Sequence, residues 1–385
     1  MIPYGRQLID QADIAAVREV LESDFLTQGP AVPAFERALA EYCGASHAVA
    51  LSNATAALHA ACLALEVGPG DVVWTSPITF VASANCALYC GAEVDFVDID
   101  PRTYNMCPAA LEAKLSAAER DGRLPKVVIP VHLAGQSCDM RRIRALADRY
   151  RFAVIEDASH AVGARYRDRP VGCGEFSDIT IFSFHPVKII TTAEGGLAVT
   201  NSESLANRMS LLRSHGITRD PALMHQADEG AWYYEQINLG FNYRMTDMQA
   251  ALGLSQFAKL DRFVERRRAI ASHYDRALGD ESLVLPWQSP ETRSSYHLYP
   301  IRIRGDEAMG RRRFFNSLRR QGLGVNVHYI PVYLQPFYRQ RGFEPGHCPQ
   351  AETYYSSAVS IPLHPGMSDL DCDTVVSAVL AALDE

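Results

Sequence analysis

The 385-residue sequence lacks the features that direct a chain into or across a membrane. No apolar run approaches the roughly 20 residues that a membrane-spanning helix requires. The start, Met1 to Arg6, has no long apolar region of the kind found in a signal peptide. Basic blocks are scarce too, since the net charge is −8 and the arginine runs at 266–268 and 311–313 are short. We therefore expect a cytoplasmic protein with neither a membrane nor a nucleic-acid partner.

Cysteine pairs and metal motifs are also missing. The nine cysteines are an odd, scattered set. Cys86 and Cys90 lie four residues apart on one expected helix, but no second pair or nearby histidine in the sequence completes a zinc motif. Reduced thiols and no metal are expected. With 48% apolar and 21% charged residues, a chain of this length suffices for a two-domain globular enzyme with a full core.

Strand and helix patterns alternate along the first 250 residues, which predicts an α/β fold with a mostly parallel sheet covered by helices on both faces. The expected strands span 47–51, 71–75, 94–97, 126–132, 152–157, 178–184 and 196–200. A long helix is expected over 246–278. Beyond it, strand patterns at 296–303 and 325–330 and helix patterns at 307–321 and 370–383 predict a smaller α+β domain. We place the boundary near residue 250, which gives a large domain 1–250 and a small domain 251–385.

The stretch Phe182-Ser183-Phe184-His185-Pro186-Val187-Lys188 brings a lysine to the end of an expected strand. His-Pro cannot continue a helix or a central strand, so Lys188 follows the strand end, beside Ile189 and Ile190. An amine in apolar surroundings loses hydration, which lowers its pKa and makes it a candidate Schiff-base lysine. For a lone lysine, a place on a surface loop is the commoner role.

Asp157 ends another apolar strand, and a carboxylate there needs a partner or a function. A carboxylate that faces a protonated pyridine nitrogen keeps pyridoxal phosphate an electron sink. A helix cap or a structural salt bridge is the plainer role. His160, three residues further on, could hydrogen-bond a phenolate oxygen or pack as a buried histidine.

Further candidates follow other strand ends. Ser52-Asn53-Ala54-Thr55 offers free N–H groups and a hydroxyl to an anion, or forms an ordinary helix cap. Phe80 could stack on a planar ring or belong to the core. Ser183 could donate to a phosphate, and Gly195-Gly196 allows a close approach of the backbone.

The order and spacing of these elements resemble the fold-type I pyridoxal-phosphate enzymes, and the motifs resemble the DegT-type family of sugar-nucleotide aminotransferases. The matching motifs lie at 27–30, 53–58, 77–82, 131–136, 156–158, 182–188, 194–196 and 240–245. A narrower likeness, to members that act in pseudaminic acid synthesis, is carried by residues 2–4, 184–188 and 327–333. Ala193 stands where the family commonly has a glycine.

The resemblance implies a seven-stranded sheet and a role for each matching residue. Lys188 would form the Schiff base with pyridoxal 5′-phosphate, and Asp157 would pair with its ring nitrogen. The other cofactor contacts it implies are Ala54, Thr55, Phe80, His160 and Ser183. The sugar-nucleotide contacts it implies are Tyr4, Thr27, Arg244, His328 and Tyr329. It also implies a homodimer with shared active sites, in which Asn242 reaches the neighbouring subunit's cofactor phosphate.

The implied reaction moves the amino group of L-glutamate, by way of pyridoxamine phosphate, to the C4 ketone of a UDP-linked 4-keto-6-deoxy-N-acetylhexosamine in pseudaminic acid or related surface-glycan synthesis. Another nucleotide-linked 4-keto-6-deoxy sugar, a pyridoxal-phosphate-dependent dehydratase, a cofactor-binding sensor and a general α-amino-acid aminotransferase are the alternatives. Lys188 disfavours the dehydratases, because those of this family carry a histidine in its place. The sequence identifies no arginine for the α-carboxylate that a general aminotransferase commonly binds.

Overall fold

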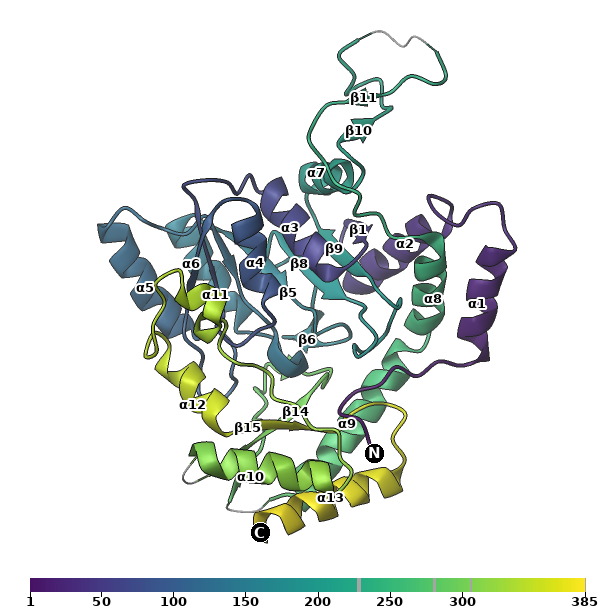
Figure 1. Cartoon of the computed structure of the whole chain (residues 1–385). Helices are drawn as coiled ribbons and strands as arrows, with labels where there is room; N and C mark the ends of the chain where they lie inside the picture. The colour runs from purple at the N-terminus through teal and green to yellow at the C-terminus, as the bar shows by residue number, and fades with distance from the viewer. Residues whose placement is uncertain (227–229, 280–281, 305–306, 385) are drawn as a thin grey trace.

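A seven-stranded sheet forms the centre of the computed structural model, which describes residues 1–226, 230–279, 282–304 and 307–384 (Figure 1). Its strand order is β1-β9-β8-β5-β4-β2-β3. Neighbours from β8 to β3 are parallel, whereas β9 runs antiparallel to both β1 and β8. The predicted mostly parallel sheet is therefore confirmed. Its strands are β1 (His47–Leu51), β2 (Val72–Thr75), β3 (Glu93–Phe96), β4 (Val127–Ile129), β5 (Ala153–Asp157), β8 (Ile179–Ser183) and β9 (Gly196–Thr200).

Helices cover both faces of this sheet because its strands are apolar on both sides. Along β4, Val127 and Ile129 pack towards one layer of helices, while Val128 between them packs towards the other. The first layer contains α3 (Ala54–Ala64), α4 (Ala82–Tyr89) and α7 (Glu203–Arg213). The second layer contains α2 (Ala31–Cys43), α5 (Pro108–Arg120), α6 (Met140–Tyr150) and α8 (Asp247–Phe257).

Local capping explains where several helices begin and end. The Asn53 side chain accepts a hydrogen bond from the Ala56 amide at 2.8 Å, which starts α3. Gly44 ends α2 at a φ of 72°, in the left-handed region that favours glycine. At α1 (Gln11–Leu21), Asp10 and Asp13 form a reciprocal capping box.

A second apolar cluster surrounds an antiparallel sheet in the C-terminal part of the chain. Its order is β12-β14-β15. The three strands and the helices around them are α9 (Leu260–Ala277), β12 (Leu283–Val284), β14 (Tyr299–Ile303), α10 (Glu307–Arg320), α11 (Pro336–Arg339), α12 (Pro349–Ser357), β15 (Ala358–Ile361) and α13 (Asp369–Asp384). The predicted domain boundary at residue 250 falls within α8 and stays a prediction.

Two expected elements differ from the structure. The long helix over 246–278 is in fact α8 and α9, which are separated at Ala258 and Lys259. The Lys259 ammonium binds the carboxylates of Asp10 and Asp13 there, an interaction that no local pattern encodes. The segment 325–330 is not a strand. Only Asn326 of this segment forms a β-bridge, with Ser360, and residues 327–330 are not assigned to any strand.

An arm projects from the body of the molecule beyond α7 (Figure 1). It carries the two-stranded ribbon of β10 (Ile217–Thr218) and β11 (Glu235–Gln236). A small sheet, β13-β6-β7, lies elsewhere on the body and consists of β6 (Arg165–Tyr166), β7 (Arg169–Pro170) and β13 (Thr292–Arg293).

The contact between β9 and the start of α3 allows a test of the fold. A Cβ atom added at Gly196 would lie 2.5 Å from the Ala54 amide nitrogen and the Asn53 backbone. We expect Gly196→Ala to lower the free energy of unfolding by about 1–3 kcal/mol in urea titrations, because backbone atoms cannot move aside freely. Gly68→Ala is the control, since the described atoms leave that position open within 4 Å. Equal stability of the two variants would contradict this close approach.

Candidate active site

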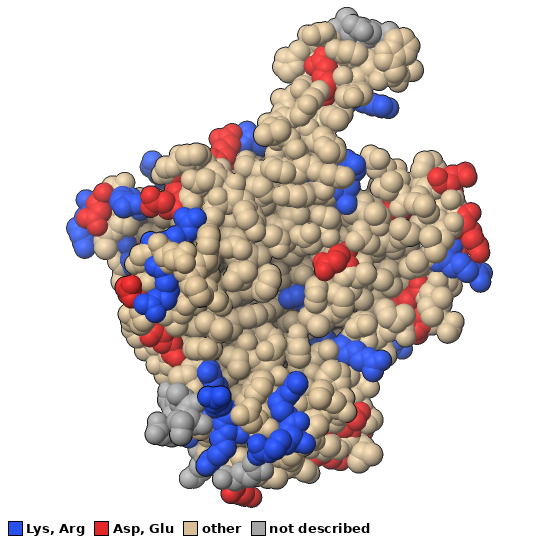
Figure 2. Space-filling model, viewed as in Figure 1, with Lys and Arg blue, Asp and Glu red and all other residues tan. Residues whose placement is uncertain are grey.

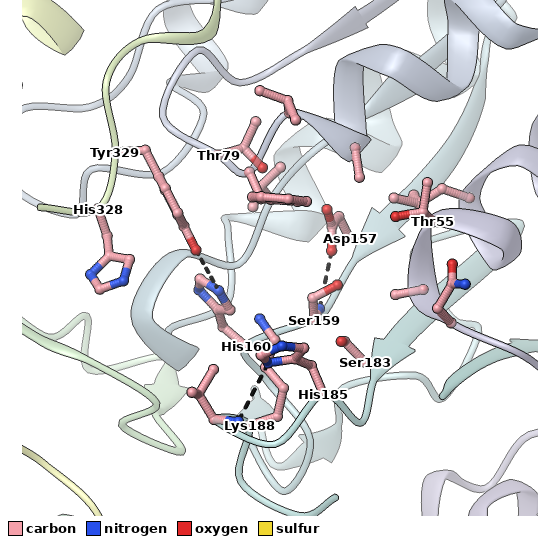
Figure 3. A pocket seen from close by; sticks show the side chains of 18 of the residues that line it. Thr55, Thr79, Asp157, Ser159, His160, Ser183, His185, Lys188, His328 and Tyr329 are labelled. Carbon is pink, nitrogen blue, oxygen red and sulfur yellow. Dashed lines mark hydrogen bonds between the residues drawn. The ribbon is translucent and has the colours of Figure 1, made fainter. Parts of the chain in front are cut away.

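A cavity of about 890 Å³ opens at the carboxyl ends of the parallel strands. Its opposite wall comes from residues 326–330 and from Tyr4 near the N-terminus. Figure 3 shows side chains from β5, β8, the α3 start and this wall converging on one space. Ten of the predicted site residues line it: Tyr4, Ala54, Thr55, Phe80, Asp157, His160, Ser183, Lys188, His328 and Tyr329.

Lys188 projects into the cavity from the loop that joins β8 to β9. The ends of the loop are tied together, because the Phe184 amide donates to the Gly195 carbonyl at 2.9 Å and the Thr192 amide donates to the Phe184 carbonyl at 3.0 Å. Burial of the ammonium lowers the pKa of Lys188 to about 8, against an opposing effect of Asp157. About a tenth of the amine is therefore neutral at pH 7, far more than for an exposed lysine.

Ala193 has a backbone conformation that glycine, the residue common at this place in the family, would adopt without strain. Its φ is 64°, in the left-handed region where a side chain carries a penalty of roughly 1 kcal/mol. The loop nevertheless closes around it, since the Ala193 amide donates to the Thr191 hydroxyl at 3.0 Å. The alanine is thus accommodated with Lys188 still in the cavity.

Asp157 lies at the end of β5, where its carboxylate has two hydrogen-bond donors. The Ser83 hydroxyl donates to Oδ2 at 2.6 Å, and the Ser159 amide donates to Oδ1 at 3.1 Å. The Ser83 hydroxyl is also hydrogen-bonded to that of Thr79 at 2.7 Å. These contacts fix the direction of a buried carboxylate that lines the cavity (Figure 3).

An anion could bind between the start of α3 and the end of β8. Ala54 and Thr55 form the first turn of α3, whose leading N–H groups have no carbonyl within the helix. Ser183, the last residue of β8, lines the same space. The absence of a side chain at Gly196 lets β9 approach the Asn53–Ala54 backbone, so this corner depends on a glycine.

Two aromatic side chains and two histidines complete the walls. Phe80 is 60% exposed, so the face of its ring is available to a planar ligand. Burial lowers the pKa of His160 well below its usual value, so its ring is neutral. Its Nδ1 accepts from the Ala134 amide at 3.3 Å, which leaves Nε2–H to donate to the Tyr329 hydroxyl at 3.2 Å. Burial, with a smaller effect of Lys188, lowers the pKa of His328 to about 3.

Three predicted site residues lie outside the cavity as this single chain forms it. Thr27 pairs with Thr246, and Arg244 pairs with Leu51, both through backbone bridges. Asn242 is exposed at the base of the arm, paired with Ser214. Their predicted roles stay predictions.

Sequence reasoning missed the residues that position Asp157. Ser83 lies four residues after Thr79 and donates to a carboxylate 74 positions away, which no motif reveals. Ser159 contributes only its backbone N–H, so its identity carries no signal. Asn326, which also lines the cavity, lies in the segment wrongly expected to be a strand.

The chain belongs to the DegT/DnrJ/EryC1/StrS aminotransferase family, whose profile matches residues 7–380. Among curated proteins, it is 40% identical over 382 residues to the spore coat polysaccharide biosynthesis protein SpsC of Bacillus subtilis, which covers 98% of this chain and 96% of that protein. It is 39% identical over 386 residues to the UDP-4-amino-4,6-dideoxy-N-acetyl-β-L-altrosamine transaminase of Campylobacter jejuni, which covers 100% and 98%.

Comparison with solved structures supports the same family assignment. Helicobacter pylori PseC, an aminotransferase of pseudaminic acid biosynthesis, superposes with a TM-score of 0.91 at 32% identity and covers 100% of this chain and 99% of PseC. Streptococcus pneumoniae Spr1654 in its PMP form superposes with a TM-score of 0.92 at 31% identity and the same coverage, and its PLP form gives 0.91 at 30% identity, covering 100% and 98%. The predicted family and the fold-type I architecture are confirmed.

The lowered pKa of Lys188 predicts a pH-dependent gain in stability when the amine is removed. Its pKa is about 8 in the folded protein and about 10.4 in an unfolded chain, so the unfolded state binds more protons between these values and stability rises with pH there. Below pH 8, we expect cofactor-free Lys188→Met to be more stable than the parent by on the order of 2 kcal/mol, allowing for water that reaches the half-buried side chain.

That advantage should shrink between pH 8 and 10.5 and then vanish. Urea titrations across this range measure it. Lys126→Met is the control, because Lys126 forms a partly exposed pair with Asp71 outside the cavity. An advantage of Lys188→Met that stays constant from pH 7 to 11 would contradict the desolvated amine.

Proposed function

We propose that this aminotransferase moves the amino group of L-glutamate to the C4 ketone of a UDP-linked 4-keto-6-deoxy-N-acetylhexosamine, in pseudaminic acid or related surface-glycan synthesis. The observation that carries the reaction type is a lysine of lowered pKa that shares one cavity with a buried, doubly hydrogen-bonded aspartate. The substrate class is supported by the C. jejuni and H. pylori relatives, named for an amino-sugar transaminase and for pseudaminic acid biosynthesis.

Pyridoxal phosphate is the cofactor of this family member, in line with the PLP and PMP forms of Spr1654. The residues of the cavity fit it. Under our proposal, the Lys188 amine would hold its aldehyde carbon, Asp157 its ring nitrogen and Phe80 its ring face. When bound, the cofactor supplies an electron sink for the carbanion that forms at a substrate carbon. The phosphate would bind the corner formed by Ala54, Thr55 and Ser183.

The Lys188 amine would move the proton in both half-reactions. A pKa of about 8 leaves about a tenth of the free amine neutral at pH 7, so it can accept a proton from the glutamate Cα and deliver it to C4′ of the cofactor. In the second half, it would carry a proton from C4′ to C4 of the sugar. The tied ends of its loop hold the base of this side chain beside the cavity.

Asp157 and His160 would hold the ring in position. The donors Ser83 and Ser159 fix the direction of the Asp157 carboxylate, which would then face the ring nitrogen. His160 is neutral and bonded to Tyr329, so it links the β5 end to the opposite wall of the cavity. We place Tyr4, His328 and Tyr329 against the sugar, because they form that wall.

The lining of this chain's cavity has too few cationic side chains to balance the negative charge of a sugar nucleotide. Lys188 is the only lysine or arginine among the described lining residues. Figure 2 shows few charged side chains around the central hollow, while basic side chains gather lower down, over the C-terminal helices. We therefore assign Arg244 and Thr27 to the substrate in the assembled enzyme, as the family resemblance implies.

We also propose a homodimer with shared active sites. The arm exposes large apolar side chains, with Trp232 71% and Leu239 77% exposed, which favours a protein surface as their partner. A second copy of this chain is the occupant that we infer, because Asn242 lies exposed at the base of the same arm. Asn242 would then contact the phosphate in the partner's cavity.

For its location we propose the cytoplasm. Among the described residues, no helix combines the length and the apolarity needed to cross a bilayer. All nine cysteines are free thiols, which fits a reducing compartment.

The proposed reaction can be tested with holoenzyme, L-glutamate and a small panel of UDP- and dTDP-linked 4-keto-6-deoxy sugars. We expect an amino sugar and 2-oxoglutarate in equal amounts, with the UDP-linked N-acetylhexosamine the best acceptor. Lys188→Ala should lower the rate about 10⁴-fold or more, because it removes both the covalent anchor and the proton carrier.

Lys126→Ala is the matched control and should react like the parent, since Lys126 lies outside the cavity. Mass spectrometry and NMR of the sugar distinguish gain of an amine from loss of water. A dehydrated product, or undiminished transfer by Lys188→Ala, would refute the proposal.

Shared active sites predict that two defective variants complement each other when they are assayed at a cofactor concentration too low to saturate the Asn242→Ala homodimer. In a mixed dimer of Lys188→Ala with Asn242→Ala, one site has its own Lys188 and the partner's intact Asn242, whereas the other site has neither. We expect about half of the parental activity per mixed dimer. The Asn242→Ala homodimer should bind the cofactor roughly tenfold more weakly or worse, because it loses a hydrogen bond to a charged group.

Differently tagged chains, purified by two affinity steps, give the mixed dimer. A size measurement by ultracentrifugation accompanies the assay. If Asn242 served its own subunit, neither site would be intact and the mixed dimer would show no such recovery.

A further inference from the structure

A second buried carboxylate lies directly before Asp157, on the other face of β5. Successive residues of a strand point to opposite faces of the sheet, so Glu156 faces away from the side chain of Asp157. Val154, on the same face as Glu156, packs in the layer of α5 and α6. Glu156 is 4% exposed and is not among the described residues that line the cavity. A carboxylate buried there requires hydrogen-bond donors.

Three side chains hydrogen-bond to the Glu156 carboxylate. His132 Nε2 lies 2.7 Å from Oε2, and the hydroxyls of Ser177 and Thr180 donate to Oε1 at 2.5 and 3.2 Å. The Cys138 amide in turn donates to Nδ1 of the histidine at 3.2 Å. Burial alone would raise the pKa of Glu156, but its hydrogen bonds, that to His132 foremost, outweigh burial and lower it. The cluster thus joins the chain after β4 to β5 and to the start of β8.

The same histidine also holds the backbone of Asp157. The His132 amide donates to the Asp157 carbonyl at 3.0 Å, and the Asp157 amide donates to the Pro130 carbonyl at 2.9 Å. Pro130 has no N–H of its own, which removes one hydrogen bond from the pairing of β4 with β5 just before this point. The bond between the side chains of His132 and Glu156 therefore ties the two strands together where the backbone ladder is weakened.

We propose that the His132–Glu156 pair is a positioning element, which holds the end of β5 so that the Asp157 carboxylate stays in line with the cofactor's ring nitrogen. This inference rests on the role of Asp157 in the proposed function. Neither member of the pair touches the ring; both act through the backbone of Asp157. A carboxylate keeps a nearby base protonated only at short range, so a small displacement of the strand end would weaken its hold on the ring proton.

The proposal is tested by ¹⁵N NMR of the holoenzyme at pH 8, loaded with pyridoxal phosphate labelled at the ring nitrogen. We expect the signal of a protonated ring in the parent. The double variant His132→Leu/Glu156→Met should fold, because apolar side chains of similar size replace both partners and leave neither unpaired. We expect its signal to move toward that of an unprotonated ring. Its single-turnover rate with L-glutamate should fall roughly 100-fold, as misplaced reacting groups do.

Two further variants separate positioning from general stability. Glu156→Gln should keep the signal of the protonated ring, because its amide oxygen can accept from His132 while its N–H groups donate to the two hydroxyls. Glu36→Gln is the matched control, since Glu36 is another carboxylate with a hydrogen bond, from Arg213 at 2.5 Å, and lies outside the cavity lining. It should leave the ring signal unchanged even where it lowers the free energy of unfolding.

Asp157→Asn distinguishes a failure of this inference from a failure of the proposed function. A ring that stays protonated in Asp157→Asn would overturn the role of Asp157 and with it this inference. If Asp157→Asn loses the protonated ring but the double variant keeps both the signal and the parental rate, only the role of the pair is refuted. Should the double variant not fold, Glu156→Met alone provides the same test, because it keeps the bond from the Cys138 amide to His132.

Discussion

The active site depends on the dehydration of one amine. An ammonium at a protein surface is stabilised by water, but that of Lys188 faces a cavity and has lost enough of this stabilisation to lower its pKa to about 8. Dehydration alone would favour pushing the side chain out into solvent. The closed loop from Phe184 to Gly195 opposes this, because its backbone hydrogen bonds hold the base of the side chain in place.

The direction of the strands explains why the other groups meet at this amine. Parallel strands end at one edge of a sheet, so Asp157 of β5 and Ser183 of β8 emerge side by side. The single reversal at β9 then brings Gly196 to the same edge, where the missing side chain lets the start of α3 approach. Each group is thus placed by the backbone, and hydrogen bonds such as that from Ser83 only set its final direction.

Much of this arrangement could be predicted from the sequence, because the signals are local. Short apolar strands mark the sheet, Asp157 is the last residue of one strand, and Lys188 lies in the loop that follows another. The break between α8 and α9 could not be predicted, since it coincides with ion pairs from Lys259 to Asp10 and Asp13, far away in the sequence. Residues 325–330 resemble a strand in sequence because apolar residues alternate there, yet in the structure His328 and Tyr329 line the cavity.

Burial disfavours the charged form of Lys188, so this amine holds its proton less tightly than an exposed lysine does. At Lys188 the opposing carboxylate of Asp157 is too weak to restore the charge, and the result is an amine that can exchange protons near neutral pH. The reactivity of the amine therefore depends on the carboxylate that faces it, and α4 helps to set the direction of that carboxylate, because Ser83 on this helix donates to Asp157.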